Sequence, residues 1–353
     1  MKKAWFLFLF FLPSFGGIKL MPHPGGIYHS AFPDFGGPED RVTCARIREF
    51  ERLAGKKIVW AFFSNNWLQG IRFPEKSVRE ISRCGALPFV RLMARSSFNF
   101  GPDPVYTLQN IIQGKFDRPL REWARQARKY GGPLLVEFGV EMNGDWFPWS
   151  GYWNGAGETT GYGDPHLPDG PERFRDAYRH IIEVFRREGA HNITWFFHAN
   201  AESFPRTAWN RPGNYYPEND YIDWVGVSVY GPIFPEERQD WESLGFKERF
   251  LKAYLELRRV APRKPLAVLE FGVIEDPRKP SWIRQAFDFI KEFPEIKAIS
   301  WWHERWENGD GSFSDLRINS SAPALEEYRK QVKSPLFKTA PVFNLPPYFL
   351  HPR

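Results

Sequence analysis

The sequence predicts an α/β protein built as a single (β/α)8 TIM barrel. Eight apolar segments recur along the 353 residues, helical patterns lie between them, and each apolar segment ends in polar or aromatic residues. Regular alternation of strands and helices is typical of a parallel barrel. A doubly wound open sheet is the alternative, but no glycine-rich phosphate loop follows the first apolar segment.

The expected strands are short apolar segments, and a glycine or a nearby proline follows each expected helix as a stop signal. Strands are expected over residues 26–35, 57–66, 87–96, 133–143, 192–200, 223–231, 265–273 and 298–306. Helices are expected over residues 38–54, 75–84, 120–130, 173–188, 248–260 and 281–293.

The two ends of the chain are expected to lie outside the barrel domain, which spans residues 18–332. Residues 1–17 read MKKAWFLFLFFLPSFGG, in which two lysines precede an apolar run and small residues. This pattern is typical of a signal peptide, and the run is too short to span a bilayer. A buried N-terminal strand or helix is the alternative. We therefore expect a secreted or periplasmic protein, with a proline-rich tail over residues 333–353 packed on the barrel.

Charge and cysteine content favour an ordinary soluble surface without a metal centre. The formal charge is +6, and basic residues are scattered over the expected helices. This distribution favours a solvated surface over a nucleic-acid interface. Cys44 and Cys84 are expected at opposite ends of the barrel, so no disulfide is predicted between them. No Cys/His cluster has the spacing of a zinc site.

Two of the expected strands end in a glutamate. The segment LLVEFGVEMNGDWFPW carries Glu141, and the later segment LAVLEFGV carries Glu270. In a parallel barrel the C-terminal ends of the strands meet at one rim, where active sites are found. Two carboxylates at that rim are what glycoside hydrolysis requires. Glu141 could instead be a helix-capping or surface acid, and Glu270 could simply pair with a basic residue.

Other side chains at the same rim suit the binding of a sugar, because amides bind hydroxyl groups and aromatic rings stack on sugar faces. The candidate substrate-binding residues are Asn66, Arg91, Asn143, Trp146, Trp149, His198, Asn200, Tyr230 and Trp302. His198 and Tyr230 could also be core residues.

The alternation of side chains along a strand allows one further prediction. Glu137 and Glu141 should share one face of the fourth strand, with Glu137 deeper in the barrel. A deep carboxylate needs a partner, and Arg91 on the neighbouring strand is the natural candidate. We therefore interpret Glu137 as structural and Glu141 as catalytic.

At these residues the chain resembles glycoside hydrolase family 26, in a large clan of (β/α)8 retaining enzymes. The acid/base of that family lies in a Glu-Met-Asn-Gly-x-Trp-Phe-x-Trp pattern, which residues 141–149 match. The resemblance, over roughly residues 114–306, implies that Glu141 is the acid/base and Glu270 the nucleophile. It also implies that Tyr230 holds the nucleophile and that Trp302 forms the floor of the adjoining sugar subsite.

One position departs from the family pattern. The family usually has a histidine immediately before the acid/base, which helps to bind the substrate near its 2-hydroxyl group, and this chain has Val140. The usual Arg-Pro lead-in is replaced by Glu137 and Phe138. The resemblance therefore implies the catalytic chemistry more directly than the sugar.

The resulting hypothesis is an exported retaining endo-β-glycosidase, with β-1,4-mannan as the first choice of substrate. A β-1,3- or mixed-linkage β-glucanase or a β-xylanase of the same fold is an alternative, and a non-catalytic carbohydrate-binding barrel is an alternative of another class. The mechanism needs no cofactor and no metal. The expected partner is a polysaccharide or oligosaccharide, not nucleic acid, with no stable membrane insertion after the signal peptide is removed. A hydrogen bond from Tyr230 should keep Glu270 ionised.

Overall fold

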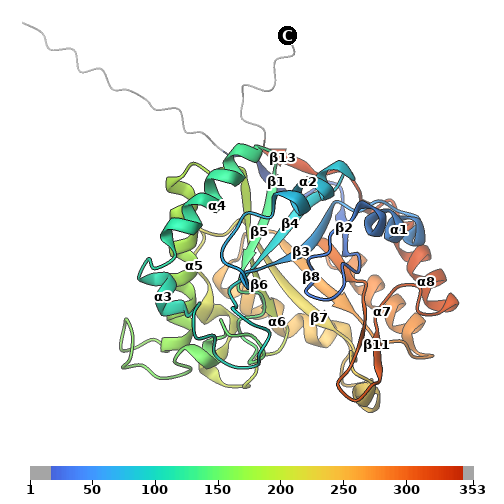
Figure 1. The fold of residues 1–353 in the computed structure, drawn as a ribbon. Helices are drawn as coiled ribbons and strands as arrows, with labels where there is room; N and C mark the ends of the chain where they lie inside the picture. Colours follow the sequence, from blue (N-terminus) through green and yellow to red (C-terminus); the bar gives the residue numbers. More distant parts are fainter. Residues whose placement is uncertain (1–16, 345–353) are drawn as a thin grey trace, which may run out of the picture.

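The computed structural model of the chain describes residues 17–344 (Figure 1). The predicted signal peptide therefore lies, apart from Gly17, outside the described residues, as do residues 345–353 of the predicted tail.

Eight parallel strands form a closed barrel, which confirms the predicted fold class (Figure 1). The barrel strands are β2 (Ile27–Phe32), β3 (Trp60–Asn66), β4 (Leu87–Met93), β5 (Leu134–Phe138), β6 (Ile193–Asn200), β7 (Trp224–Tyr230), β8 (Leu266–Gly272) and β9 (Ile296–Trp302). Each strand pairs with the next, and β2 pairs with β9 to close the barrel. A closed parallel barrel has its C-terminal strand ends at one rim, where the expected site should lie.

Six helices correspond to the predicted ones. They are α1 (Cys44–Ala54), α2 (Glu75–Arg83), α4 (Asp117–Tyr130), α5 (Asp169–Arg187), α6 (Phe246–Val260) and α7 (Lys279–Glu292). The predicted stop signals act as expected at two of them, since Gly55 after α1 and Gly131 after α4 have left-handed φ values of 68° and 73°. Glycine adopts this conformation without a steric penalty.

Several elements were not predicted from the sequence. They are α3 (Leu108–Ile112), α8 (Ala322–Val332), the hairpin of β10 (Arg305–Glu307) and β11 (Phe313–Asp315), and the 3-10 helices η1 (Gly151–Asn154), η2 (Ala208–Asn210), η3 (Pro212–Tyr215) and η4 (Pro235–Asp240). The last predicted strand ran to residue 306, but β9 ends at Trp302 and the chain then enters the hairpin. Periodicity alone could not separate these two consecutive extended segments.

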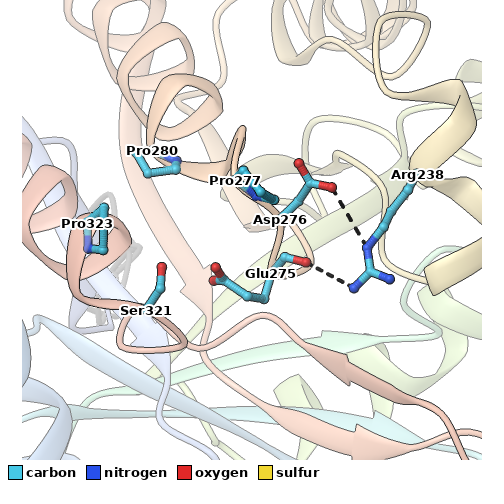
Figure 2. Close-up of a pocket in the computed structure, with 7 residues that line it drawn as sticks. All are labelled: Arg238, Glu275, Asp276, Pro277, Pro280, Ser321 and Pro323. Carbon is cyan, nitrogen blue, oxygen red and sulfur yellow. Dashed lines mark hydrogen bonds and ion pairs between the residues drawn. The ribbon is translucent and has the colours of Figure 1, made fainter.

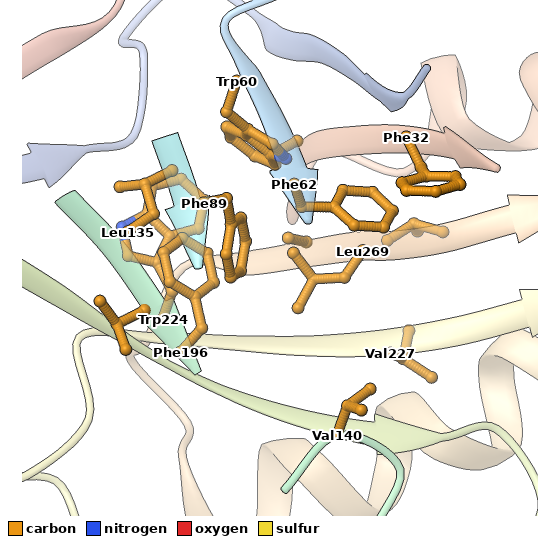
Figure 3. Close-up of a cluster of buried hydrophobic side chains, with 14 of the residues drawn as sticks. Phe32, Trp60, Phe62, Phe89, Leu135, Val140, Phe196, Trp224, Val227 and Leu269 are labelled. Atoms are coloured by element: carbon orange, nitrogen blue, oxygen red, sulfur yellow. The ribbon is translucent and has the colours of Figure 1, made fainter. Parts of the chain in front are cut away.

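Aromatic side chains fill part of the barrel interior (Figure 3). Phe89 and Phe196 have ring centroids 4.7 Å apart, and Phe196 stacks on Trp224 at 5.6 Å. Trp60 packs edge-on against both phenylalanines. The strands are buried on both faces, which explains their continuous apolar sequences.

The two ends of the described chain pair with each other. Strand β1 (Lys19–Met21) pairs antiparallel with β13 (Val342–Asn344). Strand β12 (Phe337–Lys338) adds to the first residues of β2 in parallel. This pairing lies at the N-terminal ends of the barrel strands, opposite the rim that carries Glu270.

Cys44 and Cys84 form a disulfide, so the prediction of no bridge was wrong. Their Cα atoms are 5.6 Å apart, within the usual range for a disulfide. The prediction assumed that α1 and α2 lie level with one another. Instead, the start of α1 meets the end of α2, where the backbone N–H of Cys44 donates to Oε1 of Glu80 at 3.0 Å.

Among residues 17–344, no helix combines the length and the apolar character needed to cross a membrane.

Candidate active site

A cavity of about 440 Å³ opens at the C-terminal ends of the barrel strands. We call it the barrel cavity. Its lining combines carboxylates, one arginine and aromatic rings, as sugar sites do. The lining residues are Gly37, Glu39, Arg91, Glu141, Trp146, Phe147, Tyr230, Ile233, Phe234, Glu270, Trp302, Glu304 and Trp306. The structure thus brings together six of the predicted site residues, namely Arg91, Glu141, Trp146, Tyr230, Glu270 and Trp302.

Glu270 reaches the cavity from a β-bulge in β8. Val227 pairs with Val268 and Ser228 pairs with Glu270, so Leu269 is the extra residue on the β8 strand. A bulge of this kind redirects the side chains that follow it. Gly226 on β7 leaves the room that Leu269 needs, because a Cβ at Gly226 would lie 2.2 Å from the Leu269 side chain.

Two neighbours hold the Glu270 carboxyl group. The Tyr230 hydroxyl donates to Oε2 of Glu270 at 2.6 Å, so the two residues are in the contact that the sequence predicted. Nη2 of Arg91 lies 3.1 Å from the other oxygen, Oε1. The Glu270 side chain is buried, with 4% of its surface exposed. Its position is therefore set by a phenol on one oxygen and a guanidinium on the other.

Glu141 reaches the cavity by a different route, from a turn rather than a strand. Strand β5 ends at Phe138, and both Gly139 and Glu141 have left-handed φ values of 64° and 53°. A glutamate in this region is strained and needs support from its surroundings. The backbone N–H of Glu141 donates to the His198 carbonyl at 2.9 Å, and the Trp146 indole N–H donates to Oε2 of Glu141 at 2.9 Å. The expected strand was too long, so strand parity does not place Glu141.

Arg91 lies between the cavity and the barrel interior and contacts carboxylates on both sides. Its guanidinium lies 3.1 Å from Glu39, 3.2 Å from Glu137 and 3.1 Å from Glu270. The predicted pairing of Glu137 with Arg91 is confirmed. Burial alone would lower the pKa of Arg91, but Glu270, Glu39 and Glu137 outweigh burial and raise the pKa above its ordinary value. Arg91 is therefore a fixed positive charge beneath the cavity.

The pKa of Glu270 departs from the expectation that this residue stays fully ionised. Burial raises the pKa of Glu270 to about 7, and repulsion from Glu141 acts in the same direction. Arg91, His198 and the Tyr230 hydrogen bond lower the pKa but do not cancel the effect of burial. Glu270 is therefore close to half ionised near neutral pH.

Two of the predicted substrate-binding residues, Asn143 and Asn200, hydrogen-bond the backbone instead of lining the cavity. The Asn143 side chain, fully buried, donates to the Asn200 carbonyl at 3.0 Å and accepts from the Asn200 N–H at 2.8 Å. The Asn200 side chain in turn donates to the Glu202 carbonyl. Because these amides already bind the backbone, the structure does not support a direct sugar contact for either residue.

Asn66, Trp149 and His198 also lie away from the cavity lining. Asn66 donates to the Pro38 carbonyl at 2.8 Å and accepts from Arg95. Trp149 is fully buried and donates to the Val140 carbonyl at 2.8 Å. Their polar atoms are satisfied within the fold, which does not support the predicted contacts with substrate.

His198 belongs to the network beneath the cavity. Its ring nitrogens lie 2.9 Å from Glu137 and 2.8 Å from the Ser228 hydroxyl. Burial alone would lower the pKa of His198, but the charge and the hydrogen bond of Glu137 raise it above the ordinary value. His198 is thus a core residue, the alternative given above, and it pairs with a buried carboxylate.

Sequence reasoning missed Glu39, Glu304 and Trp306. Glu39 lies in the loop after β2, has a left-handed φ of 59°, and accepts hydrogen bonds from Ser64 and Arg91. No sequence pattern predicts that a loop residue such as Glu39 lines the cavity. Glu304 and Trp306 follow Trp302 at intervals of two, and all three line the cavity. Strand-like alternation in WWHERW was the signal that could have found them.

A second cavity, which we call the rim cavity, has a volume of about 460 Å³. Its lining residues are Arg238, Glu275, Asp276, Pro277, Pro280, Ser321 and Pro323 (Figure 2). Arg238 donates to the Glu275 carbonyl at 3.0 Å and lies 3.9 Å from the Asp276 carboxylate. No predicted site residue lines it. Within the described part of the chain, no group of three or more His, Cys, Asp or Glu side chains is arranged to hold a metal ion.

A barrel of this type, with two buried glutamates from β8 and from the turn after β5 at one cavity, is an arrangement suited to glycoside hydrolysis. Residues 107–246 match the model of glycosyl hydrolase family 26. The chain is therefore similar to this family over that range. The matched range contains Glu141 and Tyr230, whereas Arg91 and Glu270 lie outside it.

Two relatives illustrate the similarity in sequence. Endoglucanase H of Acetivibrio thermocellus is 29% identical over 295 residues, which cover 81% of this chain and 29% of the relative. A β-1,3-xylanase of a Vibrio species is 20% identical over 257 residues, covering 65% of this chain and 50% of the relative. The chain therefore spans half or less of the length of these relatives.

Solved structures share the fold at low identity. The catalytic domain of a family 26 endo-β-1,4-mannanase from Bacillus sp. JAMB-750 has a TM-score of 0.64 and 16% identity, over 89% of this chain and 87% of that one. A family 26 β-mannanase from Bacteroides ovatus has a TM-score of 0.59 and 15% identity, over 89% and 90% of the two chains. These likenesses concern the barrel fold.

Proposed function

We propose that the chain is an exported retaining endo-β-glycosidase that cleaves a β-linked polysaccharide in the barrel cavity. The observation that carries the proposal is the pair Glu141 and Glu270 at one cavity in two different environments. Glu141 accepts a hydrogen bond from an indole, whereas Glu270 lies between a phenol and a guanidinium. Paired carboxyl groups with separate roles are the requirement of glycoside hydrolysis.

In the first step Glu270 attacks the anomeric carbon, and the bond from that carbon to the glycosidic oxygen breaks. Glu141 gives its proton to the departing oxygen, so the products are a glycosyl ester of Glu270 and a shortened polysaccharide. In the second step Glu141 takes a proton from water, whose oxygen attacks the anomeric carbon and releases Glu270. Two displacements at one carbon retain the anomeric configuration.

The neighbours of the two glutamates orient them for these roles. Tyr230 and Arg91 each contact one oxygen of Glu270, which restricts rotation of the carboxyl group. The Trp146 indole fixes Glu141, whose backbone is held to the His198 carbonyl. Such preorganisation brings the reacting groups into position before the substrate binds.

For the substrate we favour a β-linked glucan over the β-1,4-mannan that was our first choice from sequence. Val140 stands where family members usually carry a histidine near the 2-hydroxyl, the position at which mannose and glucose differ. Its side chain is 1% exposed and belongs to the apolar cluster (Figure 3). The similarity to a protein named endoglucanase H, over 81% of this chain, also supports glucan.

A panel of β-1,4-mannan, mixed-linkage β-glucan, β-1,3-glucan and β-xylan tests the proposal by the release of reducing sugar. We expect the highest kcat/KM on a β-glucan, with retained configuration in the first-formed product by NMR. A preference for mannan would overturn the glucan assignment alone. Binding without hydrolysis of any polysaccharide would support the non-catalytic carbohydrate-binding barrel.

Export is supported by the predicted signal peptide and by the Cys44–Cys84 disulfide, because disulfides persist mainly in oxidising compartments. Expression of the full chain in a bacterial host, followed by N-terminal sequencing of the protein from the periplasm or medium, tests this part. We expect a mature protein that begins near residue 18. Recovery of the chain in the cytosol with its first residues intact would contradict export.

A further inference from the structure

Glu304 lines the barrel cavity but has no part in the mechanism above. It lies two residues after Trp302, whose indole N–H donates to Oε2 of Glu304 at 3.0 Å. The residue is 8% exposed. Among the described residues, Oε1 of Glu304 has no hydrogen-bond partner. This oxygen is not one of the fully buried side-chain atoms that lack a partner, so it remains open to solvent. A polar atom that faces a cavity and has no protein partner is left for water or a ligand.

The surroundings of this oxygen suit a sugar ring. Trp302 and Trp306 line the same cavity on either side of Glu304 in sequence. The Trp302 ring is fixed, because Phe32 stacks against it with ring centroids 4.4 Å apart. Indoles that pack against the apolar face of a sugar leave its hydroxyl groups at the edge of the ring, where a carboxyl group can bind them.

Trp302 also lies close to the proposed nucleophile. The Arg91 guanidinium is 5.5 Å from the centre of the Trp302 ring and 3.1 Å from the Glu270 carboxylate. A sugar that packs on Trp302 is therefore the one whose anomeric carbon Glu270 attacks. Glu304, bonded to the indole nitrogen, then lies at the edge of that same sugar.

The protonation of Glu304 differs from that of an ordinary surface glutamate. Burial raises the pKa of Glu304 to about 8, and the charges of Glu39 and Asp34 act in the same direction. The Trp302 hydrogen bond and Arg91 lower the pKa, but by less. At neutral pH the group is therefore mainly a neutral acid, with an O–H to donate.

We propose that Glu304 is a substrate-binding and specificity-determining residue that hydrogen-bonds a hydroxyl group of the sugar packed on Trp302. This inference rests on the proposed function for the identity of the ligand as a β-linked saccharide.

The test measures the Kd of a mixed-linkage β-glucan tetrasaccharide by calorimetry, with all chains carrying Glu270→Ala so that the ligand is not hydrolysed, and with the chain that has no further change as the wild-type reference. Glu304→Ala should weaken binding about ten-fold, the effect of losing one hydrogen bond to the ligand. Glu304→Gln should bind within about three-fold of wild type, because an amide both accepts from Trp302 and donates to a hydroxyl. Glu307→Gln, on the exposed β10 strand, is the matched control.

A second background separates direct contact from positioning of the indole. Glu304→Ala is repeated in the Trp302→Phe variant, in which the indole N–H is absent. A direct contact predicts a further loss of affinity in that background, whereas disappearance of the loss would mean that Glu304 acts only through Trp302 and would overturn the proposal. An unchanged Kd in Glu304→Ala would also overturn it.

Failure of the proposed function gives a different result. A wild-type chain that binds the tetrasaccharide but hydrolyses no polysaccharide contradicts the glycosidase mechanism, and the Glu304 comparison can still be read from Kd values. A wild-type chain that binds no tetrasaccharide from the four polysaccharides contradicts both proposals.

Discussion

The barrel cavity and the rim cavity are almost equal in volume, at about 440 and 460 Å³. They differ in what their carboxyl groups contact. In the rim cavity Asp276 accepts hydrogen bonds from the Arg278 side chain and backbone, and these bonds lower the pKa of Asp276. In the barrel cavity burial raises the pKa of Glu270 to about 7 and that of Glu304 to about 8.

This difference teaches that volume does not identify the site. In the rim cavity the Asp276 carboxylate has its own partner, Arg278, which favours the ionised form. In the barrel cavity burial makes ionisation costly for Glu270 and Glu304, whose neighbours are aromatic rings and Arg91. Groups with displaced pKa values can exchange protons near neutral pH, which is what acid, base and nucleophilic roles require.

The largest expected effect comes from removing the proposed nucleophile. Glu270→Ala should reduce kcat on the best polysaccharide by a factor on the order of 10⁴ or more, because no covalent intermediate can form. Steady-state kinetics and a circular dichroism check of folding provide the measurement, with Glu307→Ala as the control. Near-wild-type rates in Glu270→Ala would mean that the nucleophile is wrongly assigned.

Glu141→Ala should have a smaller and more selective effect. Loss of general acid catalysis costs roughly 10²–10⁴ in rate for polysaccharides, whereas aryl glycosides with good leaving groups should keep their first step. Azide should then accelerate the second step and yield a glycosyl azide of retained configuration, identified by NMR. Equal losses for polysaccharide and aryl glycoside, without azide rescue, would contradict the acid/base role.

The pH dependence follows from the displaced pKa of Glu270. The nucleophile must be ionised, and with a pKa of about 7 it becomes protonated as the pH falls below that value. The value of kcat/KM should therefore decrease about ten-fold per pH unit below 7. A profile that stays flat down to pH 5 would show that Glu270 ionises at its ordinary pKa in solution.

Tyr230→Phe sharpens the same point. It removes the hydrogen bond to Glu270, which costs roughly 1.5–3 kcal/mol for a charged acceptor and so about ten- to hundred-fold in kcat/KM near neutral pH. The bond lowers the pKa of Glu270, so its loss should move the acidic limb of the profile to higher pH. A smaller kcat with an unmoved limb would restrict Tyr230 to contact with the substrate.

The sequence predicted the parts of the site that depend on one strand or on a local motif. Glu270 follows from its place at the end of an apolar strand, and the Arg91–Glu137 pair follows from side-chain alternation on the fourth strand, consistent with the observed register between β4 and β5. Glu141 came from its motif, although the strand argument for it was wrong because the chain turns at Gly139.

The missed features depend on contacts between loops. Glu39 meets Arg91 across 52 residues of sequence, and Asn143 meets Asn200 across 57. The Cys44–Cys84 disulfide joins two helices whose relative height no periodicity encodes. Such contacts depend on the path of each loop, which the alternation of apolar residues does not specify.

The smallest expected effect concerns the rim cavity. Arg238 is partly exposed, with 40% of its side chain accessible, and contacts Asp276 at 3.9 Å. A contact of this length with one exposed partner contributes little to stability, and Asp276 keeps its bonds to Arg278 when Arg238 is removed. Arg238→Ala should therefore leave kcat/KM on the best polysaccharide within about two-fold of wild type, and the melting temperature nearly unchanged. If Arg238→Ala instead raised KM as strongly as Glu304→Ala weakens binding, the rim cavity would have to be counted as part of the substrate path. The contrast drawn between the two cavities would then fail.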